Sequence, residues 1–371
     1  MKRYGKSHAS EDTVIPRLFL TLLAFGIGFA AAQETATDYI QGGNDYLSAG
    51  DCQFAQYYFQ EALDLEADNI DAALGKGRAL VCQGAYPTGI EEFQRVIGLN
   101  PSSIKAHIYL AQAYRSQYES DPNTYGARLS DALGIVENAE QIDANNPELL
   151  NVKGVVFFRL GNMEEARTAL ERAVTLSSEM STQDQATMQI NLGKTYLQLD
   201  EMDLALQAFK RAVSLDPANA SAHNNVGATY FALGDCEQGI YELTQAVNLQ
   251  PNSVDAAFNL GRALFDCEQV DASVPRFEAA IEVPGALNIP ELYTYLSRAY
   301  VLQGRFDEAV VRAQQGALLP PTTAEALFHL GQAYEARGRA SDTDDAIEAY
   351  KSALELEPEF SAAQTALERL Q

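Results

Sequence analysis

The stretch GKTYLQLDEMDLALQAFKRAVSLDP, residues 193–217, is followed 34 residues further on by GATYFALGDCEQGIYELTQAVNLQP, residues 227–251. In both copies Tyr follows Gly by three residues, and a small residue follows that Tyr by nine. A large apolar residue, Ala and Pro then follow at the same spacing in both. A fixed period of this length is the sequence signature of a solenoid, in which each repeat packs only against its neighbours. The 371-residue chain therefore needs no single central core.

Each repeat divides into two helical halves. Apolar residues recur at steps of three and four, as with Leu192 and Tyr196 in one half and Ala205 and Phe209 in the other. Gly and Asp, as at Gly234, mark the turn between the halves, and Pro follows the second half. Small residues let two helices cross closely, and the aromatic residue fills the adjacent space. We therefore expect an all-α fold of stacked helix pairs.

Nine repeats and a closing helix account for the chain from residue 36 onward. The third repeat contains an insertion near 115–128, around Tyr118 to Tyr125, and a five-residue joint at 181–185 follows the fourth. In residues 361–371 we expect a closing helix whose polar side chains face water, as an array end requires. The repeats fall into three groups, 36–180, 186–287 and 290–360. The predicted repeats are 36–69, 70–103, 104–146, 147–180, 186–219, 220–253, 254–287, 290–323 and 324–360.

The skeleton resembles the tetratricopeptide repeat (TPR) family over residues 36 to about 360. One departure is the absence of Trp, which the family often has at the fourth position; that position here holds Leu150, Gln189, His223 and Ala257. The resemblance implies a right-handed superhelix of antiparallel helix pairs whose first helices line the concave face. It also implies a protein-binding scaffold, because that is what such arrays typically are.

Residues 1–32 differ from the rest of the chain. Basic residues come first, and the stretch 18–32 then contains no charge. Ala30 and Ala32 are the small residues that a signal-peptidase site requires. Because the apolar run is shorter than the roughly 20 residues that span a membrane, the pattern favours a secretory signal peptide cut after Ala32. We therefore expect an exported protein, in the periplasm or cell envelope or secreted; an uncleaved membrane anchor is the alternative.

The formal net charge is −25. Such a field repels the phosphates of nucleic acids and of anionic lipids, so the composition argues against binding to either. A membrane contact is expected only through an uncleaved anchor. The acidity itself has two interpretations, which are solubility of a long exposed array and attraction of a basic partner.

Four cysteines are present: Cys52, Cys82, Cys236 and Cys267. Three pairings are possible in principle. Because each repeat touches only its neighbours, the pairs Cys52–Cys82 and Cys236–Cys267 are the ones expected, and export favours their oxidation. The alternative is four small buried side chains without disulfides.

The family resemblance also indicates which first-helix positions face a ligand. One position holds Asn191, Asn225 and Asn259, a ladder of amides that can both donate to and accept from a peptide backbone. Three residues further along these helices lies a basic set, and one turn beyond it an aromatic set. The basic set is Arg78, Lys194, Arg262 and Arg298, and the aromatic set is Phe158, Phe231 and Phe265. The alternative interpretations are a common repeat feature for the Asn residues, ion pairs within the array for the basic residues, and core packing for the aromatic residues.

The sequence contains no recognisable catalytic or cofactor motif. No His pair has the spacing of metal ligands, and neither a Gly-rich phosphate loop nor a nucleophile elbow occurs. We therefore predict no enzyme activity, no metal and no cofactor. The function predicted is an exported adaptor that binds proteins or peptides in its concave groove and organises a cell-envelope complex. The alternatives are a polysaccharide-binding protein and a subunit that activates an envelope enzyme.

Overall fold

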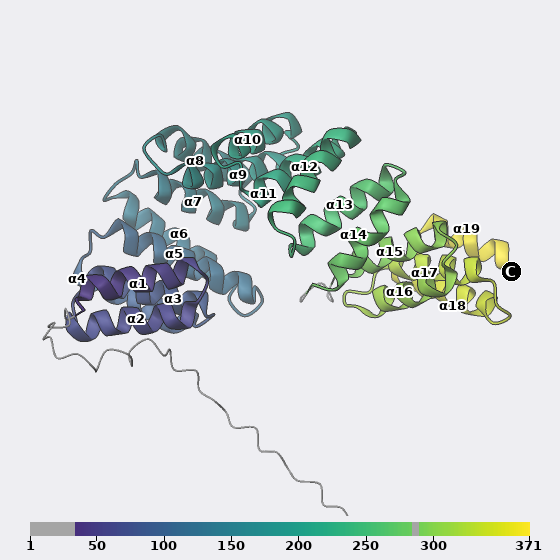
Figure 1. Ribbon diagram of the computed structural model, residues 1–371, viewed down its shortest axis with the longest axis horizontal. Coiled ribbons are helices and arrows are strands. Elements are labelled where there is room, and N and C mark those ends of the chain that lie inside the picture. Colours follow the sequence, from purple (N-terminus) through teal and green to yellow (C-terminus); the bar gives the residue numbers. More distant parts are fainter. Residues whose placement is uncertain (1–33, 284–288) are drawn as a thin grey trace, which may run out of the picture. The chain divides into compact units, whose positions relative to one another are not determined.

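The computed structural model describes residues 34–283 and 289–371 (Figure 1). Every regular element within these ranges is an α-helix, which confirms the predicted all-α solenoid. The predicted signal peptide, residues 1–32, lies outside the described residues. The helices are α1 (Ala36–Ser48), α2 (Cys52–Leu65), α3 (Ile70–Cys82), α4 (Tyr86–Leu99), α5 (Ile104–Ser120), α6 (Arg128–Glu140), α7 (Pro147–Leu160), α8 (Met163–Leu176), α9 (Thr182–Gln198), α10 (Met202–Leu215), α11 (Ala220–Ala232), α12 (Cys236–Leu249), α13 (Val254–Asp266), α14 (Val270–Ile281), α15 (Pro290–Leu302), α16 (Phe306–Leu318), α17 (Ala324–Arg337), α18 (Asp342–Leu356) and α19 (Ser361–Leu370).

Local sequence signals mark the turn and the helix starts of the sixth repeat. Gly234, at φ 85°, adopts the left-handed conformation that glycine allows between α11 and α12. The Asp235 side chain then accepts a hydrogen bond from the backbone N–H of Gln238 and caps α12. Asn219 caps α11 in the same way by accepting from the N–H of Ala222. The turns and caps therefore follow from residues that recur along the sequence.

Glycine and an aromatic ring meet where the two helices of a repeat cross. A Cβ atom added at Gly193 would lie 2.5 Å from the Phe209 ring, and one added at Gly261 would lie 2.5 Å from the Phe277 ring. Both rings are fully buried. Because such a separation is too short for two carbon atoms, glycine is required for the ring to occupy this space. Burial of each Phe then contributes about 2 kcal/mol to the stability of its repeat.

The contacts divide the chain into two units, each of which is a stack of neighbours. Unit 1, up to Gln83, contains α1, α2 and α3, and α2 packs against both other helices. Unit 2, from Gly84 onward, contains α4 to α19 in its described residues. Each of these helices packs against the next one along the chain. The first helix of each repeat from α5 onward also touches the first helix of the following repeat. Contacts confined to neighbours are those of a solenoid.

Two irregular places in unit 2 take up the extra residues of the sequence. In the third repeat α5 extends to Ser120, and Asp121 accepts hydrogen bonds from two backbone N–H groups of the following turn. The predicted joint at 181–185 is mostly helical, because Ser181 caps α9 and the helix begins at Thr182. The joint is therefore an N-terminal extension of α9.

Helix α19 closes the C-terminal end of unit 2. Its Ala363 and Ala366 are buried in two clusters with side chains of α17 and α18, and the cluster of Ala366 includes Tyr350. Its opposite side carries exposed polar residues such as Gln364 and Glu368. None of the described helices is long and apolar enough to cross a membrane.

Candidate binding face

The first helices of repeats five to nine, α9, α11, α13, α15 and α17, follow one another in direct contact. We call the surface that they form the first-helix face. Because the repeats are in register, residues at one repeat position form a column across it. The predicted basic position thus holds Lys194, Arg262 and Arg298 in α9, α13 and α15.

Basic and aromatic side chains from successive repeats stack on this face. The Arg298 guanidinium of α15 lies 4.9 Å from the centre of the Phe265 ring of α13, and also 4.9 Å from that of Tyr295. One repeat earlier, Arg262 of α13 lies 5.5 Å from the Phe231 ring of α11. The same arrangement therefore recurs in adjacent repeats, each Arg resting on the aromatic residue of the preceding one.

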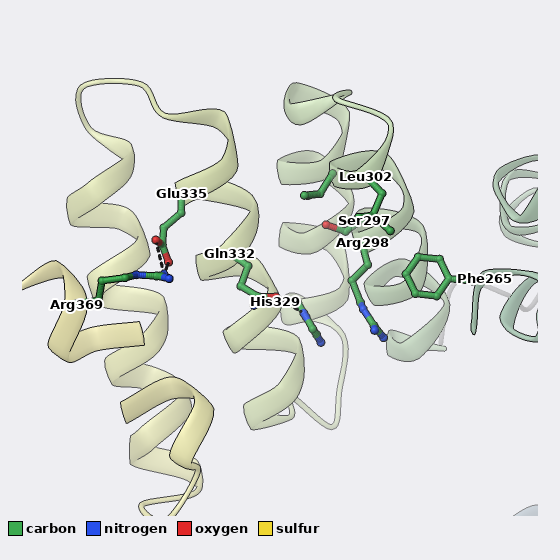
Figure 2. A pocket seen from close by; sticks show the side chains of 9 residues that line it. Phe265, Ser297, Arg298, Leu302, His329, Gln332, Glu335 and Arg369 are labelled. Atoms are coloured by element: carbon green, nitrogen blue, oxygen red, sulfur yellow. Dashed lines mark hydrogen bonds and ion pairs between the residues drawn. The ribbon is translucent and has the colours of Figure 1, made fainter. Parts of the chain in front are cut away.

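A cavity of about 380 Å³ opens beside this stack. Figure 2 shows Phe265 and Arg298 on one side and His329 and Gln332 of α17 on the other. Leu302 is 64% exposed and lies on the wall of the cavity. Its walls thus combine apolar surface with a guanidinium, an imidazole and an amide, which is a typical composition of a binding pocket.

A second cavity, of about 240 Å³, lies on the same face. Its lining includes Phe258 and Arg262 of α13, Tyr295 of α15 and Glu325 of α17. The Tyr295 ring meets Phe258 edge-on at 5.8 Å. Because Arg298 stacks on Tyr295 and lines the first cavity, the two cavities are neighbours.

The charges on this face influence one another. Burial raises the pKa of the Asp266 carboxyl, against the opposing charges of Arg298 and Arg262. Burial also raises the pKa of the Tyr295 hydroxyl, and the Asp266 charge adds to this effect. Arg262 and Arg298 thus have the Asp266 carboxyl as a common neighbour, and burial disfavours the ionised form of that carboxyl. Among the described residues neither Arg forms an ion pair within 4 Å.

His329 contributes an imidazole to the first cavity. Burial lowers the pKa of its imidazole and the Arg298 charge lowers it further, while Gln332 and Glu325 oppose the shift. The Nδ1 atom lies 2.7 Å from the Oε1 atom of Gln332, to which it donates when protonated. At pH 7 the ring is therefore mostly neutral.

The Asn ladder is largely used between repeats. Asn191 donates to the Oδ1 atom of Asn151 in the preceding repeat over 2.9 Å, and Asn259 donates to that of Asn224 over 3.0 Å. The buried Nδ2 atom of Asn225 has no hydrogen-bond partner within the described residues. The position occupied by Asn151 and Asn224 holds apolar Ile190 in the repeat before Asn225. The three amides therefore do not form an equivalent ladder.

The other predicted site residues are more dispersed. Lys194 of α9 is exposed by surface area. Desolvation by the surrounding protein nevertheless lowers the pKa of its ammonium group, and the Arg159 charge adds to this effect. Phe158 of α7 is half-buried beneath the Arg159 guanidinium at 5.8 Å. Arg78 lies on α3 of unit 1 and is exposed. The structure thus brings together Phe231, Arg262, Phe265 and Arg298, but not the whole predicted set.

The cysteines lie in the two predicted pairs, each at disulfide distance. The Cα atoms of Cys52 and Cys82 are 5.9 Å apart, and those of Cys236 and Cys267 are 6.1 Å apart. In each pair the first residue begins a second helix, and the other lies at the end of the following first helix.

Three residues of the face were missed by the sequence analysis. Tyr295 and His329 continue the column of Asn191, Asn225 and Asn259, since they occupy the same repeat position. Gln332 in turn continues the basic column. The repeat register was thus the signal that could have identified them. Across residues 34–283 and 289–371, no group of three or more His, Cys, Asp or Glu side chains is placed to hold a metal ion.

Comparison with known proteins gives one curated relative and several structural neighbours. The anaphase-promoting complex subunit CDC16 of Saccharomyces cerevisiae is 22% identical over 180 residues, which is 48% of this chain but only 20% of that protein's length. The solved structure of the APC/C hetero-tetramer Cut9–Hcn1 matches with a TM-score of 0.55 at 15% identity, over 90% of this chain and 76% of that one. The pilF structure of Pseudomonas aeruginosa matches with a TM-score of 0.52 at 19% identity, over 60% of this chain and 97% of that one. At these identities the structural similarity shows the fold alone.

Family models for the tetratricopeptide repeat match most of the array. One matches residues 40–104, 190–254 and 258–322, a second residues 147–218 and a third residues 325–359. The first alone covers more than half of the chain. The helix pairs, the glycine–aromatic crossings and these matches agree, so the chain belongs to the tetratricopeptide repeat family.

Proposed function

We propose that this chain is a non-catalytic adaptor that works outside the cytoplasm and binds a segment of another protein on its first-helix face. The TPR fold supports protein–protein interaction in general, and TPR proteins are generally scaffolds without catalytic activity. The finer proposal concerns repeats six to nine, where the two cavities and the stacked Arg residues lie.

The observation that carries this proposal is the repeated stacking of Arg on an aromatic ring beside open cavities. Arg298 and Arg262 stack on rings, and among the residues that the structure describes neither has an ion-pair partner within 4 Å. Arg and aromatic residues are the side chains most enriched among those that dominate binding energy at protein interfaces. The apolar wall at Phe265 and Leu302 adds a place for an apolar side chain of the bound segment.

Export is proposed on two grounds. The first is the signal-peptide pattern of residues 1–32, and the second is the spacing of the cysteines. Both pairs lie at disulfide distance, and disulfides persist in oxidising compartments. We propose that both pairs are oxidised in the native protein. Thiol titration of denatured protein taken from its native location should then detect no free sulfhydryl, and four would contradict export.

The groove can be tested by site-specific photo-crosslinking in intact cells. A photoreactive phenylalanine analogue at Leu302, on the cavity wall, should capture a protein partner. The same analogue at Leu318, on the second helix α16 and 82% exposed, is the matched control and should not capture it. Arg298→Ala, combined with the analogue at Leu302, should reduce the captured amount about tenfold, the loss of a strong interface contact.

The outcomes separate the possible functions. Identical adducts from Leu302 and Leu318, or adducts that do not depend on Arg298, would contradict binding on the first-helix face. Capture of a glycan without protein would favour the polysaccharide-binding alternative. If the captured protein is an enzyme, assay of that enzyme with and without this chain distinguishes activation from simple tethering.

A further inference from the structure

A cluster of five aromatic rings lies on the first helix pair of unit 1. We call it the aromatic face; it consists of Tyr39 and Tyr46 of α1 and Phe54, Tyr57 and Tyr58 of α2. Tyr46 stacks on Phe54 with ring centres 5.4 Å apart, and it meets Tyr58 at 5.1 Å. Tyr58 in turn contacts Tyr39 at 6.0 Å and Tyr57 at 5.8 Å. The five rings therefore form one connected surface.

This face is exposed, unlike the aromatic residues that fill the helix crossings. Phe54 is 48% exposed and Tyr57 is 56% exposed, whereas Phe59 of the same helix is 0% exposed. Gly42 of α1 makes room for the cluster, since a Cβ atom there would lie 2.6 Å from the Tyr58 ring. The rings are thus held against α1 by their mutual contacts while two of them remain half in solvent.

Two carboxylates, those of Glu34 and Glu61, interact with rings of the aromatic face. No Lys or Arg occurs between residues 34 and 75. A hydrogen bond with Glu34 raises the pKa of the Tyr39 hydroxyl to about 12. The charge of Glu61 raises the pKa of the Tyr57 hydroxyl. The Glu34 and Glu61 carboxylates therefore lie at the edge of the face, close to its exposed rings.

We propose that the aromatic face docks a basic segment of a partner protein, with Arg or Lys side chains over the rings and their charges facing the carboxylates. Ring faces attract cations, and the surrounding acidic residues complement the same charge. An acidic segment is disfavoured by repulsion, and so is a second copy of this chain, because both surfaces would carry the same acidic residues. This surface is separate from the first-helix face, and the proposal does not depend on the function proposed for that face.

The chain provides a matched control for this proposal. Tyr241 occupies in repeat six the position that Tyr57 occupies in repeat one, and it is 57% exposed on α12. Within the described residues, none of the close ring pairs includes Tyr241. Substitution of Tyr241 therefore removes a Tyr that is equally exposed but is not part of an aromatic cluster.

The experiment measures the affinity of a fluorescein-labelled peptide of repeating Gly-Arg-Leu for the full chain by fluorescence anisotropy. Wild type and Tyr241→Ala should bind it equally, whereas the double variant Phe54→Ala/Tyr57→Ala should bind roughly tenfold more weakly although every carboxylate is retained. Tyr57→Phe keeps the ring and should bind as wild type does. Circular dichroism verifies that helix content is unchanged, as exposure of both side chains leads us to expect.

Three results would overturn the proposal: no binding of the Arg peptide to wild type, equal binding to the double variant, or an equal loss in Tyr241→Ala. The first would mean that the face does not attract a basic segment, and the other two that the attraction is only that of the overall negative charge. A peptide of repeating Gly-Glu-Leu should not bind at this face. Arg298→Ala should leave binding of the Arg peptide unchanged, so a failure here is distinguishable from a failure of the function proposed for the first-helix face.

Discussion

At the C-terminal end of the array, α19 covers the last helix pair and turns polar residues such as Gln364 outward. At the N-terminal repeat, α1 and α2 instead expose Phe54 and Tyr57 within the aromatic face. The end of a repeat array requires a polar outer surface for solubility. The two ends therefore differ in chemistry: the described residues of α19 present polar side chains, whereas those of α1 and α2 present aromatic rings that suit the docking proposed above.

The two ends also differ in what holds them together. Three helices make up the described part of unit 1, and its Cys52–Cys82 pair brings the start of α2 to disulfide distance from the end of α3. The Cys236–Cys267 pair connects α12 to α13 in unit 2, where further helices pack on both sides. Because the Cys52–Cys82 pair joins two of the three helices described for unit 1, we expect that unit to depend more strongly on its cross-link.

The largest effect that we expect comes from removing the disulfide that we propose for unit 1. The pair closes a loop with a sequence separation of 30 residues, and such a link stabilises by about 3.5 kcal/mol when its effect is entropic. Cys52→Ser/Cys82→Ser should thus make unit 1 the first region cut in limited proteolysis. Cys236→Ser/Cys267→Ser, with a separation of 31 residues, is the matched control and should leave unit 1 protected. Identical cleavage patterns in both variants would refute the difference between the units.

The same substitution at the two ends should have a smaller but unequal effect. Phe360 meets the Phe328 ring at 5.2 Å under α19, and Phe54 meets the Tyr46 ring at 5.4 Å in the aromatic face. Phe360→Ala should cost about 2 kcal/mol because the ring is partly buried, whereas Phe54→Ala should cost at most about 0.5 kcal/mol. Native-state hydrogen exchange of the backbone amides of α18 and of α2 measures both losses of unfolding free energy. Equal costs would show that the aromatic face contributes to folding as much as the C-terminal cluster does.

The fold was predictable because each repeat encodes it separately. The steps that place Gly193 opposite Phe209 recur at Gly261 and Phe277, so errors in one repeat are corrected by the others. The helical conformation of the joint at 181–185 was not predicted, because it depends on a single cap, Ser181, which interrupts no apolar pattern.

The candidate site was predictable only in part. The columns of Arg and Phe follow from register, and Arg298 does lie over Phe265. The pairing of Asn191 with Asn151 could not be predicted from one column, because the partner occupies the adjacent position of the preceding repeat. The cluster around Tyr57 could not be predicted either, since the repeat pattern does not show which exposed rings meet: among the described residues the equivalent Tyr241 is equally exposed but belongs to no close ring pair.

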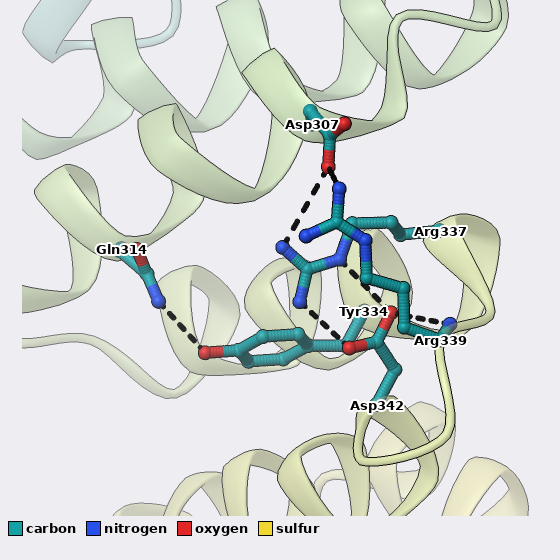
Figure 3. A network of polar contacts seen from close by, with 6 residues as sticks. All are labelled: Asp307, Gln314, Tyr334, Arg337, Arg339 and Asp342. Carbon is teal, nitrogen blue, oxygen red and sulfur yellow. Dashed lines mark hydrogen bonds and ion pairs between the residues drawn. The ribbon is translucent and has the colours of Figure 1, made fainter.

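The smallest effect that we predict concerns pH and the last helix pair. Figure 3 shows Arg337 paired with the Asp342 carboxylate, with N–O distances of 2.9 and 2.6 Å, while the backbone N–H of Arg339 donates to the same group over 2.7 Å. The bond with Arg337 is the main reason why the pKa of Asp342 falls to about 2. The N-terminal counterpart is Asp38, whose pKa is lowered by hydrogen bonds with the backbone and side chain of Thr35, without a cation.

Because the pKa of Asp342 is lower in the folded than in the unfolded chain, its contribution to stability is complete above the unfolded value, near 3.8. The contribution is lost as pH falls from there towards 2. Asp342→Asn should therefore lower Tm at pH 6, and the difference from wild type should shrink to nearly zero by about pH 2. Asp344→Asn, an exposed residue in the same first turn of α18, is the control and should change Tm little at any pH. A Tm difference for Asp342→Asn that stays constant from pH 6 to 2 would mean that the carboxylate charge does not stabilise this end of the array.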